Sequence, residues 1–223
     1  MIIVGICENE QTSKTIQILR EIIGSTKIRN SMIESYDFHS STPPRMALKS
    51  YIDELRKNDI EIAVIKIIPE RIAEGVYDNI KFNVLIYNNF KNDTGDRYND
   101  EKVIIYKKLF ESMEKQNIAI VNNDDNTVLE LLKGTRMCVI TYGLNSKATI
   151  TASSIEQDVQ DISLNYCIQR IITTLNKFAI EPQEFPIRIF SSVDKDIYAL
   201  LAAVTTAIIC GVSIKSIRQM TIL

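Results

Sequence analysis

The alternation of short apolar runs with segments of helical periodicity is the feature that most constrains the fold of this chain. Residues Ile2–Ile6 are almost continuously apolar, as expected for a strand whose two faces are both buried in a sheet. Similar runs recur along the first two thirds of the chain and predict four further strands, Ile62–Ile68, Phe82–Tyr87, Ile118–Val121 and Arg136–Tyr142. Strands that alternate with helices predict an α/β protein with a parallel sheet.

The segments between these runs have the spacing and end signals of helices. Lys14–Ile23 repeats isoleucine and leucine at helical intervals, with Gly24 at the expected C-terminal cap. Thr42-Pro43-Pro44 carries the cap and first-turn signals of a helix that runs through Leu48, Ile52 and Leu55. Three more helices are predicted at Lys102–Lys115, at Thr127–Leu132 before Gly134, and at Lys195–Cys210 before Gly211.

The character of the chain changes after Gly143. The segments Thr149–Ser154, Ile162–Gln169 and Pro186–Phe190 are expected to form antiparallel strands. No repeat, low-complexity tract or linker interrupts the chain, so residues 1–223 are interpreted as one domain.

Charge and cysteine content exclude several classes of function. A net charge of −2 without a basic block argues against nucleic acid or an anionic membrane as a partner. The single histidine, His39, and four widely separated cysteines argue against a zinc site. Cys7, Cys138 and Cys210 lie in apolar runs, which predicts reduced core cysteines in a cytoplasmic protein.

Two apolar segments also bear on localisation. The stretch Ile197–Val212 contains two threonines and is too short for a membrane span, which favours a buried helix. The N-terminal Met1–Ile6 is too short for a secretory signal and leads directly into the first strand. Both observations favour a cytoplasmic location.

The segment after the first strand is typical of a phosphate-binding P-loop in its order. A strand ending at Gly5–Ile6 is followed by a polar loop and then by Ser13-Lys14-Thr15 at a helix start. In such loops glycines let backbone N–H groups surround the phosphates, lysine contacts the outer phosphates, and Ser or Thr binds magnesium. Here Lys14 and Thr15 are in place, but Glu8 and Ser13 occupy the two glycine positions.

The carboxylates Glu8 and Glu10 disfavour a bound phosphate. A carboxylate about 4 Å from a phosphate costs roughly 4 kcal/mol per unit charge at an effective dielectric constant near 20. One charge-assisted hydrogen bond returns only about 1.5–3 kcal/mol. Taken alone, Lys14-Thr15 is therefore equally consistent with a solvated helix N-terminus.

Later segments resemble the central, ATP-binding domain of the Mur ligases, in the family's order and over nearly the whole chain. Residues 82–93, FNVLIYNNFKND, are similar to FDVAVFTNLTxDH, and residues 122–125, NNDD, match NxDD. Residues 141–145 read TYGLN, as in the family, and 196–203, DIYALLAA, resemble NVYNALAA. Ser41-Thr42-Pro43 resembles the TTP motif. The tripeptide-synthetase type is the most similar.

This resemblance implies a P-loop NTPase-like fold with a mostly parallel central sheet, helices on both faces and a small antiparallel extension. It implies ATP and magnesium as cofactors and an ATP-dependent amide-forming reaction. It also implies domains for the UDP-sugar and the amino acid, which we expect to be absent from this chain. Family nucleotide-binding positions fall on Ser13, Lys14, Thr15, Asn89, Asp93, Asp125 and Asp196.

Several positions that carry the family's chemistry are substituted. The magnesium-binding glutamate of EVSS aligns with Lys66, and the histidine after TNLTxD aligns with Thr94. The carbamylated lysine of KxxLF aligns with Tyr106, and the two asparagines of NVYN align with Asp196 and Ala199. These changes predict that no catalytic residue and no metal ligand set is retained. Asn89, Asp93 and residues 122–125 are then also consistent with ordinary loop and turn chemistry.

The substitutions reverse the charges of a phosphate-and-metal site. Lys66 lies on the metal side of the resemblance, whereas Glu8 and Glu10 lie on the phosphate side. We expect Lys66 to lie near the loop and to pair with one of these carboxylates; the alternative is that Lys66 points to solvent.

Three functions are consistent with the sequence. The first is a non-catalytic Mur-ligase-like protein that binds a protein partner, a second copy of itself or a small ligand. The second is the ATP-binding component of an acid–amino acid ligase of the cell-wall peptide type, completed by other chains. The third is a regulator that binds ATP without turnover.

Overall fold

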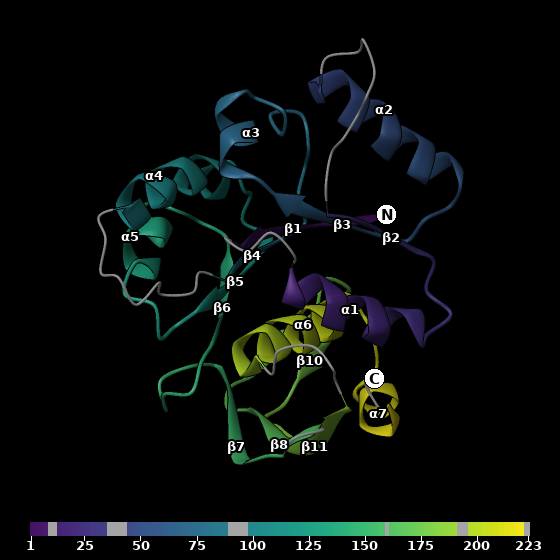
Figure 1. Ribbon diagram of the computed structural model, residues 1–223, viewed down its shortest axis with the longest axis vertical. Helices are drawn as coiled ribbons and strands as arrows, with labels where there is room; N and C mark the ends of the chain where they lie inside the picture. The colour runs from purple at the N-terminus through teal and green to yellow at the C-terminus, as the bar shows by residue number, and fades with distance from the viewer. Residues whose placement is uncertain (9–12, 35–43, 89–97, 159–160, 191–195, 221–223) are drawn as a thin grey trace. The chain divides into compact units, whose positions relative to one another are not determined.

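In the computed structural model, which describes residues 1–8, 13–34, 44–88, 98–158, 161–190 and 196–220, strands and helices alternate as the sequence predicts (Figure 1). The chain divides into two units. The first comprises Met1–Ser13, Arg29–Ala119 and Asp125–Cys138; the second comprises Lys14–Ile28, Ile120–Asp124 and Val139–Leu223. Two such units are compatible with one domain, so the single-domain interpretation stays a prediction.

The first unit is built on parallel strands. Strand β1 (Ile2–Glu8) pairs with β3 (Ile62–Ile67) on one side and with β4 (Val84–Asn88) on the other. Strand β2 (Asn30–Ile33) lies outside β3, also parallel. The resulting order, β4-β1-β3-β2, makes β1 a central strand, as its continuous apolar sequence predicts.

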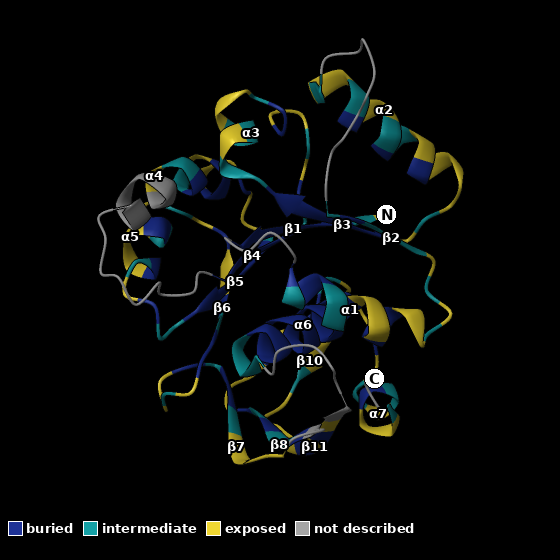
Figure 2. Ribbon diagram, in the orientation of Figure 1, coloured by how far each residue is buried: buried dark blue, intermediate teal, exposed yellow. Residues whose placement is uncertain are grey.

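Both faces of this sheet are covered. Every residue of β3, β4 and β5 (Ile118–Asn122) is buried (Figure 2). Successive residues of a strand point to opposite faces, so burial of all of them requires cover on both sides. Gly5 shows how closely one face is packed. A Cβ atom there would lie 2.6 Å from Leu85 Cδ2 and 2.9 Å from Phe82 Cε1, so glycine is required.

Four helices accompany these strands. Helix α2 (Pro44–Lys57) buries Leu48, Ile52 and Leu55, the residues whose spacing predicts it. The short helix α3 (Pro69–Ala73) begins with proline, which has no N–H to leave unsatisfied in a first turn. Helices α4 (Tyr98–Glu111) and α5 (Val128–Leu132) follow β4 and β5.

In the second unit, helix α1 (Lys14–Gly24) packs against α6 (Ile197–Ile209). Every residue of α6 from Ala199 onward is buried, which confirms that the longest apolar stretch is a core helix. Its two threonines donate their hydroxyl hydrogens to carbonyls one turn earlier, Thr205 to Leu201 and Thr206 to Ala202. None of the described helices is both long and apolar enough to cross a membrane.

The predicted antiparallel extension is confirmed. Strand β6 (Cys138–Tyr142) pairs in parallel with β7 (Ile150–Gln157), which pairs antiparallel with β8 (Asp161–Ile168), and β8 with β11 (Gln183–Phe190). The nine-stranded order is β11-β8-β7-β6-β5-β4-β1-β3-β2. Strands β9 (Ile172–Thr173) and β10 (Ala179–Ile180) form a separate hairpin, and helix α7 (Ile214–Gln219) ends the described chain.

Two local predictions are wrong. Gly24 is the last residue of α1 and does not have the positive φ of a glycine cap, whereas Gly134 and Gly211 do, with φ of 84° and 101°. Cys138 is exposed rather than part of the core, because the first two residues of β6, Cys138 and Val139, are exposed on both faces of the strand; Cys7 and Cys210 are buried as predicted. An apolar run identifies a strand but not where along the strand burial begins.

Candidate functional site

The carboxyl ends of β1 and β4 mark a topological switch point in the first unit. From β1 the chain continues to β2 on one side of the sheet, and from β4 it continues to β5 on the other. Ligands of open α/β sheets bind outside the carboxyl ends of the strands at such points. This edge is therefore the place where the fold favours a site.

Three polar side chains are buried at this edge, and we call them the carboxyl-edge cluster: Glu8, Lys66 and Asn88. They are 3%, 6% and 0% exposed. Glu8 and Asn88 end β1 and β4 and are partners in the register of these strands. The Asn88 amide donates a hydrogen bond to Glu8 Oε1 at 3.0 Å. Asparagine and glutamate thus occupy the switch point with their own hydrogen bond.

Lys66 belongs to the same face of the sheet. Its partner in β1 is Ile6, and Glu8 follows Ile6 by two residues, so Lys66 and Glu8 point to one face of adjacent strands. A strand spacing near 4.8 Å and a rise near 3.3 Å per residue place their Cα atoms roughly 8 Å apart. The alternative that Lys66 points to solvent is wrong, because the residue is buried.

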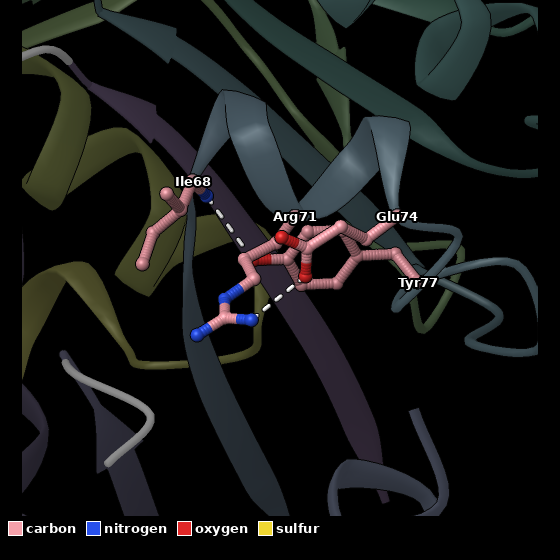
Figure 3. Close-up of polar contacts among 4 residues, drawn as sticks. All are labelled: Ile68, Arg71, Glu74 and Tyr77. Carbon is pink, nitrogen blue, oxygen red and sulfur yellow. Dashed lines mark hydrogen bonds and ion pairs between the residues drawn. The ribbon is translucent and has the colours of Figure 1, made fainter. Parts of the chain in front are cut away.

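The end of β3 next to Lys66 is held by Tyr77. The Tyr77 hydroxyl accepts a hydrogen bond from Ile68 N at 3.1 Å (Figure 3). It also donates a long hydrogen bond, 3.5 Å, to the Lys66 carbonyl. On the exposed side of the same turn, Arg71 and Glu74 form an ion pair at 2.7 Å. The Tyr77 hydroxyl thus fixes the backbone from which the Lys66 side chain extends.

The donor set of the carboxyl-edge cluster does not fit magnesium. This ion requires several hard oxygen ligands in octahedral geometry. The cluster offers one carboxylate, which already accepts from Asn88, and an ammonium group on the neighbouring strand. A buried ammonium group is stable only near a compensating charge, and Glu8 is a carboxylate on the same face.

Tyr106 lies against the opposite face of the sheet. Its ring meets Tyr87 edge-on, with centroids 5.8 Å apart and an interplanar angle of 74°. Tyr87 alternates with Asn88 along β4 and therefore faces away from the carboxyl-edge cluster. Burial is the main cause that raises the pKa of the Tyr106 hydroxyl far above its usual value, so this group is neutral. No described residue forms a hydrogen bond with it.

The described residues of the phosphate loop flank the start of α1. Lys14 is the first residue of this helix and is half-buried, while Ser13 and Thr15 are fully buried. Glu10 lies outside the described residues, as do Asn89, Asp93 and Thr94. The roles predicted for these four residues, and the predicted pairing of Lys66 with Glu10, are therefore not tested by the structure.

Asp125 and Asp196 make the local contacts of turn and cap residues. Asp125 Oδ1 accepts from Thr127 N at 2.9 Å and from Thr127 Oγ1 at 2.7 Å. Asp196 is the N-cap of α6, and its Oδ1 accepts from Ala199 N at 3.0 Å. These contacts favour the loop-and-turn interpretation, although they do not test nucleotide binding.

Sequence reasoning missed Asn88 as a site residue, and it did not single out Asp124, which makes structural contacts in the second unit. Asn88 directly follows the predicted strand Phe82–Tyr87, and the end of a parallel strand is the signal that could have identified it. Asp124 was overlooked beside Asp125, because neighbouring acids in a turn cannot be ranked without knowing their partners. Both residues accept or donate hydrogen bonds at strand ends.

The fold and the edge geometry define a class, the α/β proteins with a P-loop NTPase-like fold. Within it, residues 11–207 match the family model for the Mur ligase middle domain. The chain belongs to this family.

Similar curated proteins are named as UDP-N-acetylmuramoyl-peptide ligases. UDP-N-acetylmuramoyl-L-alanyl-D-glutamate–L-lysine ligase of Staphylococcus epidermidis is 26% identical over 134 residues, which cover 57% of this chain and 27% of the relative. The corresponding ligase of Staphylococcus aureus strain COL is 24% identical over 133 residues. The chain thus spans about a quarter of the length of the curated relatives it matches.

Solved structures share the fold over nearly the whole chain. A UDP-N-acetylmuramoyl-L-alanyl-D-glutamate–2,6-diaminopimelate ligase superimposes with a TM-score of 0.75 at 15% identity, covering 98% of this chain and 45% of the ligase. MurF ligase from Thermotoga maritima, solved in complex with ADP, gives a TM-score of 0.67 at 12% identity, covering 100% and 49%. These similarities confirm the predicted fold class.

Proposed function

We propose that the chain is a cytoplasmic, catalytically inactive Mur-ligase-like protein that acts as a binding or regulatory module. Its partner would be another protein, a second copy of the chain or a small ligand. The observation that carries this proposal is the buried Lys66 on the same face as Glu8, at the edge where the fold favours a ligand. By the family resemblance, Lys66 replaces the magnesium-binding glutamate.

Charge is the physical basis of the proposal. An ammonium group repels a dication, and Glu8 repels a phosphate. Phosphoryl transfer relies on metal ions and positive groups to stabilise the charge of its transition state. A chain with the charges at the metal and phosphate positions reversed loses the magnesium ion and, with it, the stabilisation of the transition state. In this proposal the positive charge of Lys66 and the negative charge of Glu8 compensate each other, as the charges of a dication and a phosphate would in an active site.

The relatives are named for joining an amino acid to a UDP-linked peptide. The described chain spans only part of them, so the amide-forming activity does not transfer with the fold. A non-catalytic role needs only the scaffold, and the scaffold is intact in both units.

A second candidate keeps ATP. Helix α1 begins at Lys14 with Thr15 in its first turn, which is one part of the arrangement found in phosphate-binding loops. This observation favours an ATP-binding component of an acid–amino acid ligase completed by other chains, or a regulator that binds ATP without turnover.

Measurement of phosphate release from ATP separates the proposed inactive protein from an ATP-binding component of a working ligase. We expect the purified protein with magnesium to release no phosphate above background, and Lys14→Ala to behave identically. Magnesium-dependent release that Lys14→Ala abolishes would overturn the proposal of inactivity. Release that begins only after a candidate partner chain is added would support the second candidate.

A further inference from the structure

We infer that Asp124 is a positioning residue that connects three segments of the second unit through one hydrogen-bond network. We call this the Asp124 knot and define it by Asn123, Asp124, Leu144, Asn145 and Tyr198. The segments are the end of β5, the loop between β6 and β7, and the first turn of α6. Each contains one of the motifs on which the family resemblance rests.

Both carboxylate oxygens of Asp124 are engaged. Oδ2 accepts a hydrogen bond from Leu144 N at 2.6 Å and another from the Tyr198 hydroxyl at 3.1 Å. Oδ1 accepts from the Asn145 side-chain amide. One charged group therefore receives three donors from two segments that are 20 and 74 residues away.

Asn145 also contacts Asn123 and the backbone of its own loop. Its Oδ1 accepts from Asn123 Nδ2 at 3.1 Å and from Lys147 N at 2.8 Å. The same side chain thus contacts both residues at the end of β5 and closes its own loop. This arrangement leaves the Asn145 side chain little freedom.

Gly143 is explained by the same contacts. A Cβ atom at this position would lie 2.9 Å from Asp124 Oδ2 and 3.0 Å from its Cγ. A side chain there would push the carboxylate away from the Leu144 amide. The glycine of TYGLN is therefore required by the approach of Asp124.

The electrostatics keep the knot closed at neutral pH. Burial first, and then the neighbouring Asp124 charge, raise the pKa of Tyr198 to about 12. The Tyr198 hydroxyl therefore retains its proton and donates it to Asp124 throughout the neutral range. Hydrogen bonds to a charged group are stronger than those between neutral groups.

It follows that these motifs serve architecture in this chain. Asp124 uses its carboxylate on the backbone and on side chains of its own unit, so its retention needs no bound nucleotide. This inference is independent of the proposed function, because the knot lies within the second unit and has the same role in an active or inactive protein.

Amide hydrogen exchange tests the inference on the full chain. Tyr198→Phe removes one donor and should accelerate exchange at Leu144 by about tenfold, the equilibrium equivalent of one lost charge-assisted hydrogen bond. Asp124→Ala should accelerate it by about a hundredfold and also expose amides in the first turn of α6. Asp125→Asn is the matched control and should leave Leu144 unchanged.

Unchanged amide exchange at Leu144 in both Asp124→Ala and Tyr198→Phe would overturn the inference. If Asp124→Ala fails to fold, Tyr198→Phe decides alone, because it retains the carboxylate. ATP hydrolysis by the unmodified protein would contradict the proposed function and leave this result unaffected.

Discussion

The carboxyl-edge cluster of the first unit and the Asp124 knot of the second unit have opposite relationships to the family pattern. In the cluster, the residue types implied for metal and phosphate binding are replaced, with Lys66 and Glu8 at the altered positions. In the knot, the motif residues are retained and hydrogen-bonded to one another. On the proposed function, substitution has altered the residues that would carry the chemistry and has retained those that hold the second unit together.

If the protein is inactive as we propose, this comparison explains how the motifs of the family can persist without its activity. A motif that stabilises the fold is costly to change in any member of the family, whether or not the member turns over substrate. A metal ligand is costly to change only where a metal is used. Variants of the two regions should therefore differ in what they disturb.

The largest effect is expected at Lys66. If Lys66 compensates the charge of Glu8 as we propose, Lys66→Ala should leave this carboxylate buried without a nearby cation and lower the free energy of unfolding by about 3–5 kcal/mol. Chemical denaturation measures this change. The double variant Glu8→Gln/Lys66→Met removes both charges and should recover most of the loss. If Lys66→Ala is neutral, the two charges do not balance each other.

Asp124→Ala should have the next largest effect, a loss of about 2–3 kcal/mol in the free energy of unfolding, because three donors lose a charged acceptor. A double-mutant cycle with Tyr198→Phe should give a coupling energy near 1 kcal/mol. Additive effects in this cycle would show that Tyr198 and Asp124 contribute separately.

Asp196→Ala removes the N-cap of α6 and should cost about 1 kcal/mol, a typical value for such caps. Thermal unfolding at a fixed denaturant concentration is sensitive enough for this change. Asp196→Ser is the matched control, since serine also caps helices. A loss equal in both variants would point to a role for the charge other than capping.

The smallest effect concerns the two buried thiols. Burial raises the pKa of Cys210 to about 12 and raises that of Cys7 as well, so the unfolded chain loses these protons at lower pH than the folded protein. Stability should therefore fall with rising pH, by roughly 0.7 kcal/mol per thiol between pH 8 and 9.

Denaturant midpoints across this range would measure the slope. Cys210→Ala should remove about half of the thiol contribution. A slope insensitive to Cys210→Ala would contradict the assignment.

Sequence patterns were sufficient for the central strands and for α6, because continuous apolar runs and helical spacing determine these elements directly. They were insufficient for β2, whose sequence Asn-Ser-Met-Ile is half polar, and for the short elements α3, β9, β10 and α7. An edge strand with open sides lacks the alternation that identifies a buried one, and the other four have six residues or fewer.

The site was predictable only in part. The reversed charges of Lys66 and Glu8 could be noticed from the sequence alone, whereas their position on one face follows from the register of β1 and β3. The hydrogen bond from Asn88, the opposite facing of Tyr106 and the choice of Asp124 over Asp125 depend on register and on tertiary partners. A single sequence does not contain that information.

The most direct test of the central claim is calorimetric titration of the unmodified protein with ATP, once with magnesium and once with a chelator. If Lys66 and Glu8 occupy the metal and phosphate positions, magnesium should not increase the affinity, and no binding in the micromolar range should occur in either titration. Micromolar binding of ATP that requires magnesium would contradict the account, because it would show that the carboxyl edge still accepts a metal and its phosphates.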